Sequence, residues 1–257
     1  MSLLRVEGLS KDFGGITAVQ DLDFDIAAGA IHSIIGPNGA GKTTLFNLVT
    51  GLIHPTLGSV HFQDDDVTGL PPYVLARLGI SRTFQNLQIF FNMSVLENVM
   101  VGRHLHIRRS FLPALFRLPS IARSDARCED RAVDLLGSVG LGDYVRVQAS
   151  ELPYGALKRL EIARALATEP QLLLLDEPAA GCNARETQEI DDLIQEVSAR
   201  GVTVVLVEHD MRLVMGVSDH ILVLDNGRKL AEGTAAEVRA NPEVVAAYLG
   251  TGAISTG

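Results

Sequence analysis

The sequence predicts an α/β fold, in which a layered core of parallel strands and helices carries a helical lobe inserted between roughly residues 86 and 165. Two observations predict this architecture. In the second half of the chain, short apolar runs alternate with longer stretches of helical pattern, which is typical of parallel strand–helix units. Near the N-terminus, a near-continuous apolar run at residues 30–35 leads into a glycine-rich turn and a helix that starts near Lys42.

The individual elements follow from apolar periodicity. At residues 21–26 three apolar side chains alternate with three aspartates, as in a strand with one buried face. Residues 71–167 are mostly helical in pattern, apart from a short strand at residues 80–84. The other expected elements are strands at residues 3–9, 171–175, 202–207 and 221–225, helices at residues 184–200 and 211–217, and one or two short helices at residues 234–249.

Composition excludes several classes of protein. The chain has 257 residues, and 22 Lys and Arg against 31 Asp and Glu give a formal net charge of −9. Its 47% hydrophobic content supplies a core, which excludes an intrinsically disordered chain. The acidic balance argues against nucleic acid as a partner, because that binding rests on clustered Lys and Arg. Cys128 and Cys182 are far apart and lack metal-ligand spacing, which argues against a zinc site or a disulfide scaffold.

Mean hydropathy is positive, at +0.21, which raises the question of a membrane span. A spanning helix needs about 20 mainly apolar residues, whereas the apolar runs here, such as residues 171–175 and 202–207, have the length of buried strands. The first residues also lack the basic and apolar segments of a secretory signal. We therefore expect a chain that is soluble by itself and can dock on a membrane protein.

Residues 36–43 carry the most specific motif, Gly-Pro-Asn-Gly-Ala-Gly-Lys-Thr. The pattern G-x-x-x-x-G-K-[ST] between a strand and a helix predicts a phosphate-binding loop, because glycines bring backbone N–H groups close to phosphate oxygens at a helix N-terminus. We expect Lys42 to reach the β- and γ-phosphates and the Thr43 hydroxyl to bind Mg²⁺. The candidate nucleotide-binding residues are Gly36, Pro37, Asn38, Gly39, Ala40, Gly41, Lys42, Thr43 and Thr44.

A pair of adjacent carboxylates is the second candidate half of the site. The apolar run at residues 172–175 ends in Asp176 and Glu177. Ligands bind beyond the carboxyl ends of parallel strands, so we expect both side chains near the phosphates. Asp176 is expected to help hold Mg²⁺, and Glu177 to polarise an attacking water. The alternative, a solvated acidic turn, is disfavoured by the phosphate loop upstream.

These motifs, in this order, resemble the ATPase subunits of ATP-binding cassette (ABC) transporters over nearly the full length of the chain. Further landmarks agree: they are Gln85 for the glutamine loop, residues 152–166 for the signature segment and its helix, residues 181–183 for the D-loop, His209 for the switch histidine, and Phe13 for the aromatic ring that stacks on adenine. The resemblance implies that Gln85 contacts Mg²⁺ and the water, and that His209 contacts the γ-phosphate. Each of these residues alone also has a structural reading, including Phe13 as a core residue.

The resemblance implies a fold and a domain plan. The fold is a P-loop NTPase core with an antiparallel β subdomain and an inserted α-helical subdomain, which together form the ABC ATPase fold. The expected divisions of this single domain, residues 1–257, are a nucleotide-binding core at residues 1–85 and 166–233, a helical subdomain at residues 86–165 and a C-terminal helical tail at residues 234–257.

The resemblance also implies a head-to-tail pair of ATPase subunits, identical or closely related. Each ATP then lies between the phosphate loop of one subunit and residues 152–156 of the other, where Tyr154 and Gly155 are candidate contacts in trans. The usual signature Leu-Ser-Gly-Gly-Gln is here Leu-Pro-Tyr-Gly-Ala, and Pro153 has neither a hydroxyl nor a backbone N–H. Pro153 therefore predicts a weaker ATP-driven dimer than in relatives with serine at position 153. In the D-loop, Asn183 replaces the usual aspartate, a change at a position that carries communication across the dimer in the family.

A narrower resemblance connects the chain with the ATPase subunits of branched-chain amino-acid importers, of the larger of the two usual types. The segments that carry it are residues 81–90, 93–102, 174–181, 207–215 and 246–250. Urea and amide importers and a lipopolysaccharide-export ATPase share much of this pattern and stay open as alternatives. A soluble ABC ATPase of DNA repair or translation, and a low-activity regulatory ABC subunit, are weaker alternatives. The regulatory subunit is disfavoured because the catalytic residues are intact: Lys42, Asp176, Glu177 and His209.

The importer resemblance implies partners and a location. These partners are transmembrane permease subunits and, indirectly, a periplasmic or extracellular solute-binding protein. The chain would lie on the cytoplasmic face of the inner (plasma) membrane, held there by the permease, with residues 84–97 receiving a short permease helix. Residues 103–123 mix basic and apolar side chains, and either contact the membrane subunit or lipid headgroups or pack as a helical lobe. Pro113 and Pro119 favour the lobe, because they interrupt any long helix.

Overall fold

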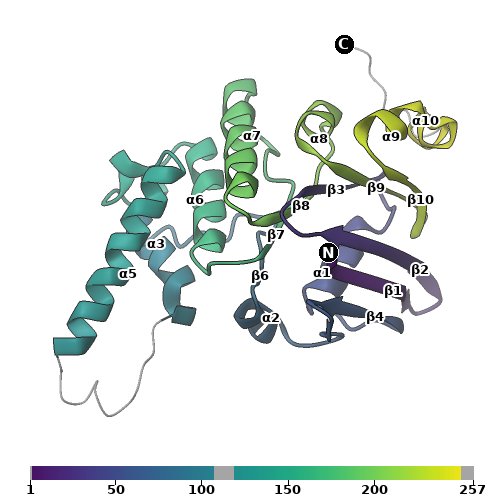
Figure 1. Cartoon of the computed structure of the whole chain (residues 1–257). Helices are drawn as coiled ribbons and strands as arrows, with labels where there is room; N and C mark the ends of the chain where they lie inside the picture. Colours follow the sequence, from purple (N-terminus) through teal and green to yellow (C-terminus); the bar gives the residue numbers. More distant parts are fainter. Residues whose placement is uncertain (1, 107–118, 250–257) are drawn as a thin grey trace.

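A six-stranded sheet forms the centre of the molecule. The computed structural model describes residues 2–106 and 119–249 (Figure 1). The strands of the central sheet are β3 (Ile31–Ile35), β6 (Ile80–Arg82), β7 (Leu172–Asp176), β8 (Thr203–Val207), β9 (His220–Asp225) and β10 (Arg228–Gly233). Their order is β10-β9-β3-β8-β7-β6, and all pairs are parallel except the β9–β10 hairpin at the edge. The predicted parallel core is confirmed, whereas β10 was not expected, because its sequence Arg-Lys-Leu-Ala-Glu-Gly is polar.

A second, antiparallel sheet lies beside the first. Its strands are β1 (Ser2–Phe13), β2 (Ile16–Ala27), β4 (Leu57–Phe62) and β5 (Asp65–Asp66), in the order β2-β1-β4-β5. Leu22, Phe24 and Ile26 of β2 are buried and the three aspartates between them are exposed, as the alternation predicted. Strand β4 was not predicted, because only two of its residues, Val60 and Phe62, are buried.

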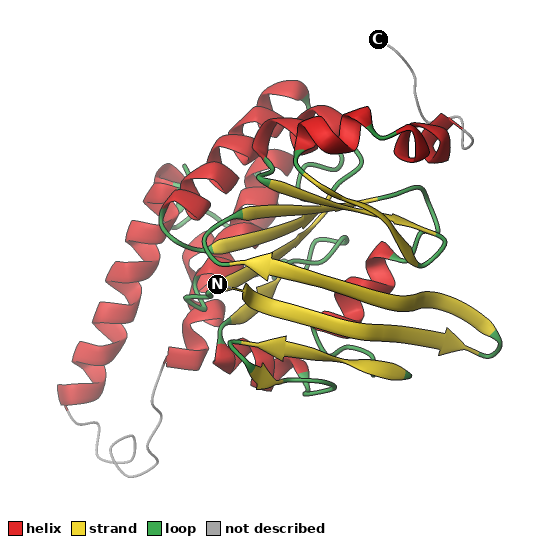
Figure 2. Ribbon diagram, turned by 45° about the vertical axis from the view of Figure 1, so that its right-hand side comes forward, coloured by secondary structure: helices red, strands yellow, loops and turns green. Residues whose placement is uncertain are grey.

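The helices form two groups (Figures 1 and 2). The first comprises α1 (Lys42–Val49), α2 (Pro72–Leu78), α7 (Ala184–Ala199), α8 (Met211–Val217), α9 (Ala235–Ala240) and α10 (Pro242–Leu249). The second comprises α3 (Val95–Gly102), α5 (Pro119–Ser138) and α6 (Tyr154–Leu166) with the 3₁₀ turns η1 (Arg103–His106), η2 (Gly142–Tyr144) and η3 (Ala149–Glu151), and it gathers on the side of the molecule away from the antiparallel sheet. Among the described residues, no helix has the length and apolar character of a membrane span.

The segment at residues 103–123 is only partly described. Helix α5 begins at Pro119, a position that proline tolerates because the first turn needs no N–H partner. Residues 107–118, which include Arg108, Arg109 and Arg117 and most of the apolar side chains of this stretch, lie outside the described residues. The choice between a membrane contact and a packed lobe therefore stays a prediction.

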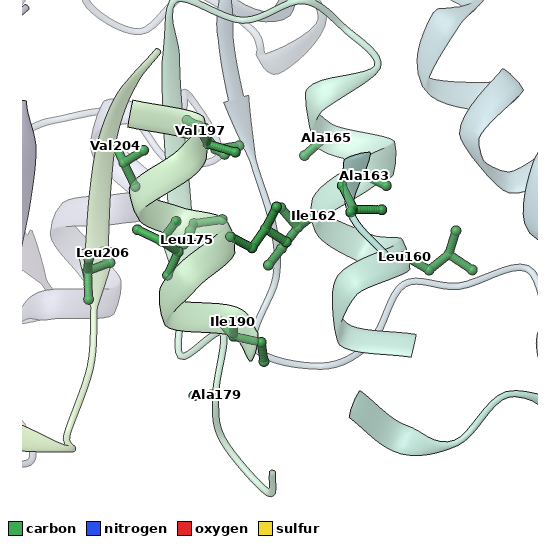
Figure 3. Packing of buried hydrophobic residues seen from close by; sticks show 14 of the residues in the cluster. Leu160, Ile162, Ala163, Ala165, Leu175, Ala179, Ile190, Val197, Val204 and Leu206 are labelled. Atoms are coloured by element: carbon green, nitrogen blue, oxygen red, sulfur yellow. The ribbon is translucent and has the colours of Figure 1, made fainter. Parts of the chain in front are cut away.

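The central sheet is buried on both faces, and this explains its sequence. Leu173 and Leu175 of β7 face a core formed with α6 and α7, where Ile162 and Ile190 pack (Figure 3). Leu172 and Leu174 face the opposite core, which contains α1 and the antiparallel sheet. A strand covered on both sides needs an unbroken apolar run, which is the pattern that predicted β3, β7 and β8.

Parallel pairing brings the functional loops to one edge of the sheet. Asp176 at the end of β7 lies opposite Val207 at the end of β8, and Ile35 at the end of β3 lies opposite Val223 of β9. The loops that follow β3, β6, β7 and β8 therefore all leave from the same edge.

Burial of His32 in β3 predicts a pH dependence of stability. Its side chain is 5% exposed, and Nε2 accepts a hydrogen bond from the Ala27 N–H at 3.1 Å. Desolvation, aided by nearby His220, lowers the pKa of His32 from 6.5 to about 4. Above pH 6.5 the residue is neutral in both states; between pH 6.5 and about 4 only the unfolded chain takes up the proton. The free energy of unfolding should thus fall with falling pH, by about 3 kcal/mol over this window.

Urea unfolding of the parent and of a His32→Gln variant, at about pH 7 and about pH 4.5, measures this contribution. The parent should lose about 2 to 3 kcal/mol more than the variant on acidification. Equal losses in the two proteins would contradict the assignment to His32.

Candidate nucleotide-binding site

The loop between β3 and α1 has a backbone that depends on glycine. Gly39 and Gly41 have φ angles of 83° and 100°, in the left-handed region that other residues avoid. A Cβ atom on Gly41, the residue before α1, would lie 2.6 Å from the Ala18 carbonyl oxygen. No side chain caps the N-terminus of α1, so its first amide groups point into the loop without a capping oxygen. This arrangement suits a phosphate group.

Lys42 points back into the loop. Its Nζ atom donates hydrogen bonds to the carbonyl oxygens of Gly36 at 2.7 Å and Pro37 at 3.0 Å, and the residue is 7% exposed. Burial lowers the pKa of Lys42, whereas the charges of Glu177 and Asp176 raise it. The ammonium group thus lies between the loop carbonyls and two carboxylates, where it can face the charge of a phosphate.

A cleft joins this loop to residues from other strand ends. It is lined by Ala18, Asn38, Gly39, Ala40, Gly41, Lys42, Thr43, Thr44, Gln85, Glu177 and His209. Its polar wall therefore comes from the loops after β3, β6, β7 and β8, as the parallel topology requires. All the residues expected to contact phosphate or water within one subunit lie on this wall or, in the case of Gly36, Pro37 and Asp176, directly beside it.

Glu177 and His209 face each other across the cleft. Glu177 Oε1 lies 2.9 Å from His209 Nε2, and the Glu177 side chain is 17% exposed. Glu177 has a φ angle of 50°, and its N–H donates to the Val207 carbonyl oxygen at 2.9 Å. Lys158 of α6 donates to the Glu177 carbonyl oxygen at 3.2 Å. The carboxylate is thus held on a fixed backbone, where it can orient a water molecule.

Asp176 has a buried arginine partner. Arg82 of β6 donates to Asp176 Oδ2 at 2.7 Å, and the two side chains are 8% and 3% exposed. Arg82 also donates to Asn47 Oδ1 and Thr50 Oγ1. This pairing offsets the cost of burying the carboxylate. Arg82 had no predicted role, because residues 80–84 mix polar and apolar side chains and give no local sign of a buried partner.

The donors at this edge fit Mg²⁺ bound together with phosphates. Thr43 is the second residue of α1 and lines the cleft. Asp176 accepts the Arg82 hydrogen bond through Oδ2, which leaves its other carboxylate oxygen for a metal ion. Mg²⁺ takes one or two protein oxygens and completes its shell with phosphate oxygens and water. Among the described residues, no group of three or more His, Cys, Asp or Glu side chains could hold a metal ion.

Three predicted contact residues lie apart from this cleft. Phe13 ends β1 with its ring 47% exposed and Lys11 Nζ 5.0 Å from the ring centroid. This exposure excludes the core alternative, and adenine stacking stays a prediction. Tyr154 and Gly155 begin α6; Tyr154 donates to the Ala180 carbonyl oxygen at 3.1 Å and the Gly155 N–H donates to Glu186 Oε1 at 3.2 Å. Their contacts in trans also stay predictions.

Helix α10 supplies a residue to which sequence analysis assigned no role. Tyr248 lines a second part of the cleft together with Gly36, Asn38, Glu177 and His209. Burial raises the pKa of Tyr248 to about 12, although a hydrogen bond with the Gly36 backbone acts in the opposite direction and lowers this pKa. More than 200 residues separate these segments in the sequence, so periodicity could not pair them.

Known proteins match nearly the whole chain. The ABC transporter family matches residues 19–180, and the branched-chain amino acid ATP-binding cassette transporter family matches residues 228–254. This chain therefore belongs to the ABC transporter family, as an ATP-binding subunit. Within the family it is similar to LivG and BraF, so the resemblance to the ATPases of branched-chain amino-acid importers is confirmed.

The relatives and solved structures cover the chain almost end to end. The high-affinity branched-chain amino acid transport ATP-binding protein LivG of Escherichia coli K12 is 46% identical over 249 residues, which span 96% of this chain and 98% of LivG. BraF of Pseudomonas aeruginosa, with the same description, is 45% identical over the same shares. The ADP conformation of MJ1267, an ATP-binding cassette of an ABC transporter, has a TM-score of 0.85 at 35% identity and covers 97% of this chain and 99% of its own. The expected ABC ATPase fold is thereby confirmed.

Proposed function

We propose that this chain hydrolyses ATP with Mg²⁺ to power the import of branched-chain amino acids through a membrane permease. The observation that carries the proposal is the cleft at the edge of the central sheet, where Lys42, Glu177 and His209 converge on the phosphate loop. The identity with LivG and BraF over nearly the full length supports the solute class, since both are described as branched-chain amino acid transport proteins.

The residues have distinct roles in phosphoryl transfer. Positioning and charge neutralisation dominate this reaction, and the protein forms no covalent bond. The loop amides and Lys42 hold the β- and γ-phosphates, and His209 contacts the γ-phosphate. Glu177 orients the attacking water. Thr43, Asp176 and Gln85 would hold Mg²⁺, which supplies further neutralisation of the phosphate charge when bound.

The working unit is a pair of such subunits on the cytoplasmic side of a permease. A dimeric relative, the cassette MJ0796 bound to ADP and Pi, has a TM-score of 0.75 at 25% identity and covers 90% of this chain. In a pair of this kind, Tyr154 and Gly155 of one subunit would approach the nucleotide of the other. The Gly155 N–H must then exchange Glu186 for a phosphate oxygen. A solute-binding protein would deliver the amino acid to the permease from outside.

Replacement of Glu177 by glutamine tests the proposed chemistry. Glu177→Gln keeps the size of the side chain but removes the charge that orients the water. The ATPase turnover number should fall about 100-fold or more, while the dissociation constant for ATP stays within about threefold of the parent value. Glu196→Gln, on the exposed surface of α7, is the matched control and should keep parental turnover. Parental turnover in Glu177→Gln would show that the assigned role is wrong.

The proline in the signature segment predicts a weak ATP-driven dimer. Pro153 precedes α6 with a φ of −64° and a ψ of 158°, a backbone shape that serine also adopts. In a Glu177→Gln background, Pro153→Ser should tighten the ATP-dependent dimer about tenfold, because it restores a hydroxyl and an N–H toward the partner's phosphate. Sedimentation velocity with ATP measures this equilibrium.

Pro153→Ala is the matched control for that comparison, since it restores only the N–H. It should give a smaller gain than serine. A dimer that is no tighter with serine than with proline would count against a trans contact at this position.

A further inference from the structure

Glu208 is a buried carboxylate to which the mechanism gives no role. It lies between the end of β8 and His209, and it is 5% exposed. Both of its oxygens accept hydrogen bonds from backbone amides: Oε1 from the Ala179 N–H at 3.0 Å, and Oε2 from the His209 N–H at 3.0 Å. The Asp210 backbone donates a further bond.

These bonds connect two separate loops. Ala179 follows Glu177 by two residues in the loop after β7, whereas His209 and Asp210 belong to the loop after β8. The side chains that face each other across the cleft, Glu177 and His209, come from these same two loops. Glu208 thus holds the backbone of one loop against the backbone of the other, next to the residues that carry the pair.

Burying the Glu208 carboxylate in its charged form costs free energy. Burial raises its pKa, as does the nearby charge of Glu177, and the backbone bonds from Ala179, His209 and Asp210 lower it. An apolar residue of similar size would avoid burying a carboxylate beside a second one. The three amide donors offset the cost, and they do so only while both loops keep their present places.

We propose that Glu208 is a positioning residue for ATP hydrolysis, which clasps the loops after β7 and β8 and so sets the place of the Glu177–His209 pair. The inference rests on the proposed ATPase function. Glu208 acts through its neighbours and need not touch the nucleotide, and the phosphate loop does not depend on it. Loss of the clasp should therefore slow turnover more than it weakens ATP binding.

Glu208→Gln tests this role with almost no change in volume. Because both carboxylate oxygens accept from N–H groups, a glutamine must turn its NH₂ group toward one of those donors. Asp219→Asn is the matched control: Asp219 Oδ2 accepts from the Ile31 N–H at 2.8 Å, far from the cleft, and an asparagine oxygen can replace it. Glu208→Asp keeps both oxygens and the charge but is one methylene shorter.

The first measurement is steady-state ATPase activity of the full chain with Mg²⁺. Glu208→Gln should lower kcat about tenfold or more while KM for ATP stays within about twofold; Asp219→Asn should keep both values. Combining Glu208→Gln with His209→Ala should give little more loss than His209→Ala alone, because both act on the same pair. A folded Glu208→Gln protein with kcat within twofold of the parent would overturn the inference.

The second measurement is hydrogen exchange at single amides, which needs no activity. The Ala179 and His209 amides should exchange about tenfold faster or more in Glu208→Gln, while amides of α1 keep the parental rate. Unchanged exchange at both positions would overturn the inference.

Should Glu208→Gln not fold, the ATPase kinetics and the amide exchange of Glu208→Asp decide the inference instead. A parent chain that does not hydrolyse ATP would refute the proposed function, while the exchange rates still decide whether the clasp exists.

Discussion

Burial of the central sheet on both faces is the constraint on which every functional side chain depends. Alternate residues of β7 point into two different cores, and a shift of the strand by one residue would bring Gln171 or Asp176 to a position now held by a buried leucine. Parallel pairing then places the ends of β3, β7 and β8 at one edge. Lys42, Glu177 and His209 lie within reach of one another because these three strands end together.

The edge of this sheet concentrates features that oppose stability. Lys42, Asp176 and Glu208 are charged and almost fully buried, and Glu177 has a left-handed backbone. Each buried charge is compensated locally: Lys42 by loop carbonyls, Asp176 by Arg82, and Glu208 by backbone amides. Such groups persist only where surrounding structure fixes them, and they gather where charge must be held in place. The large apolar cores on either side supply that support.

The parts of the structure that could be predicted are those that a short stretch of sequence specifies by itself. The phosphate loop, the acidic pair and the central strands each have a short pattern with a direct physical meaning, and their positions follow from parallel topology. Strand β4 and strand β10 escaped notice because each buries few side chains and mixes polar residues with apolar ones. Arg82, Glu208 and Tyr248 escaped it because their partners, Asp176, Ala179 and Gly36, lie far away along the chain.

Calorimetric titration of ATP with Mg²⁺ into the purified chain, beside a Lys42→Ala variant, tests the central claim most directly. The account predicts saturable binding of one nucleotide per chain in the parent, and binding at least about tenfold weaker in the variant, because the alanine leaves phosphate charge without its buried cation. Absence of binding in the parent, or equal affinity in the two proteins, would contradict it.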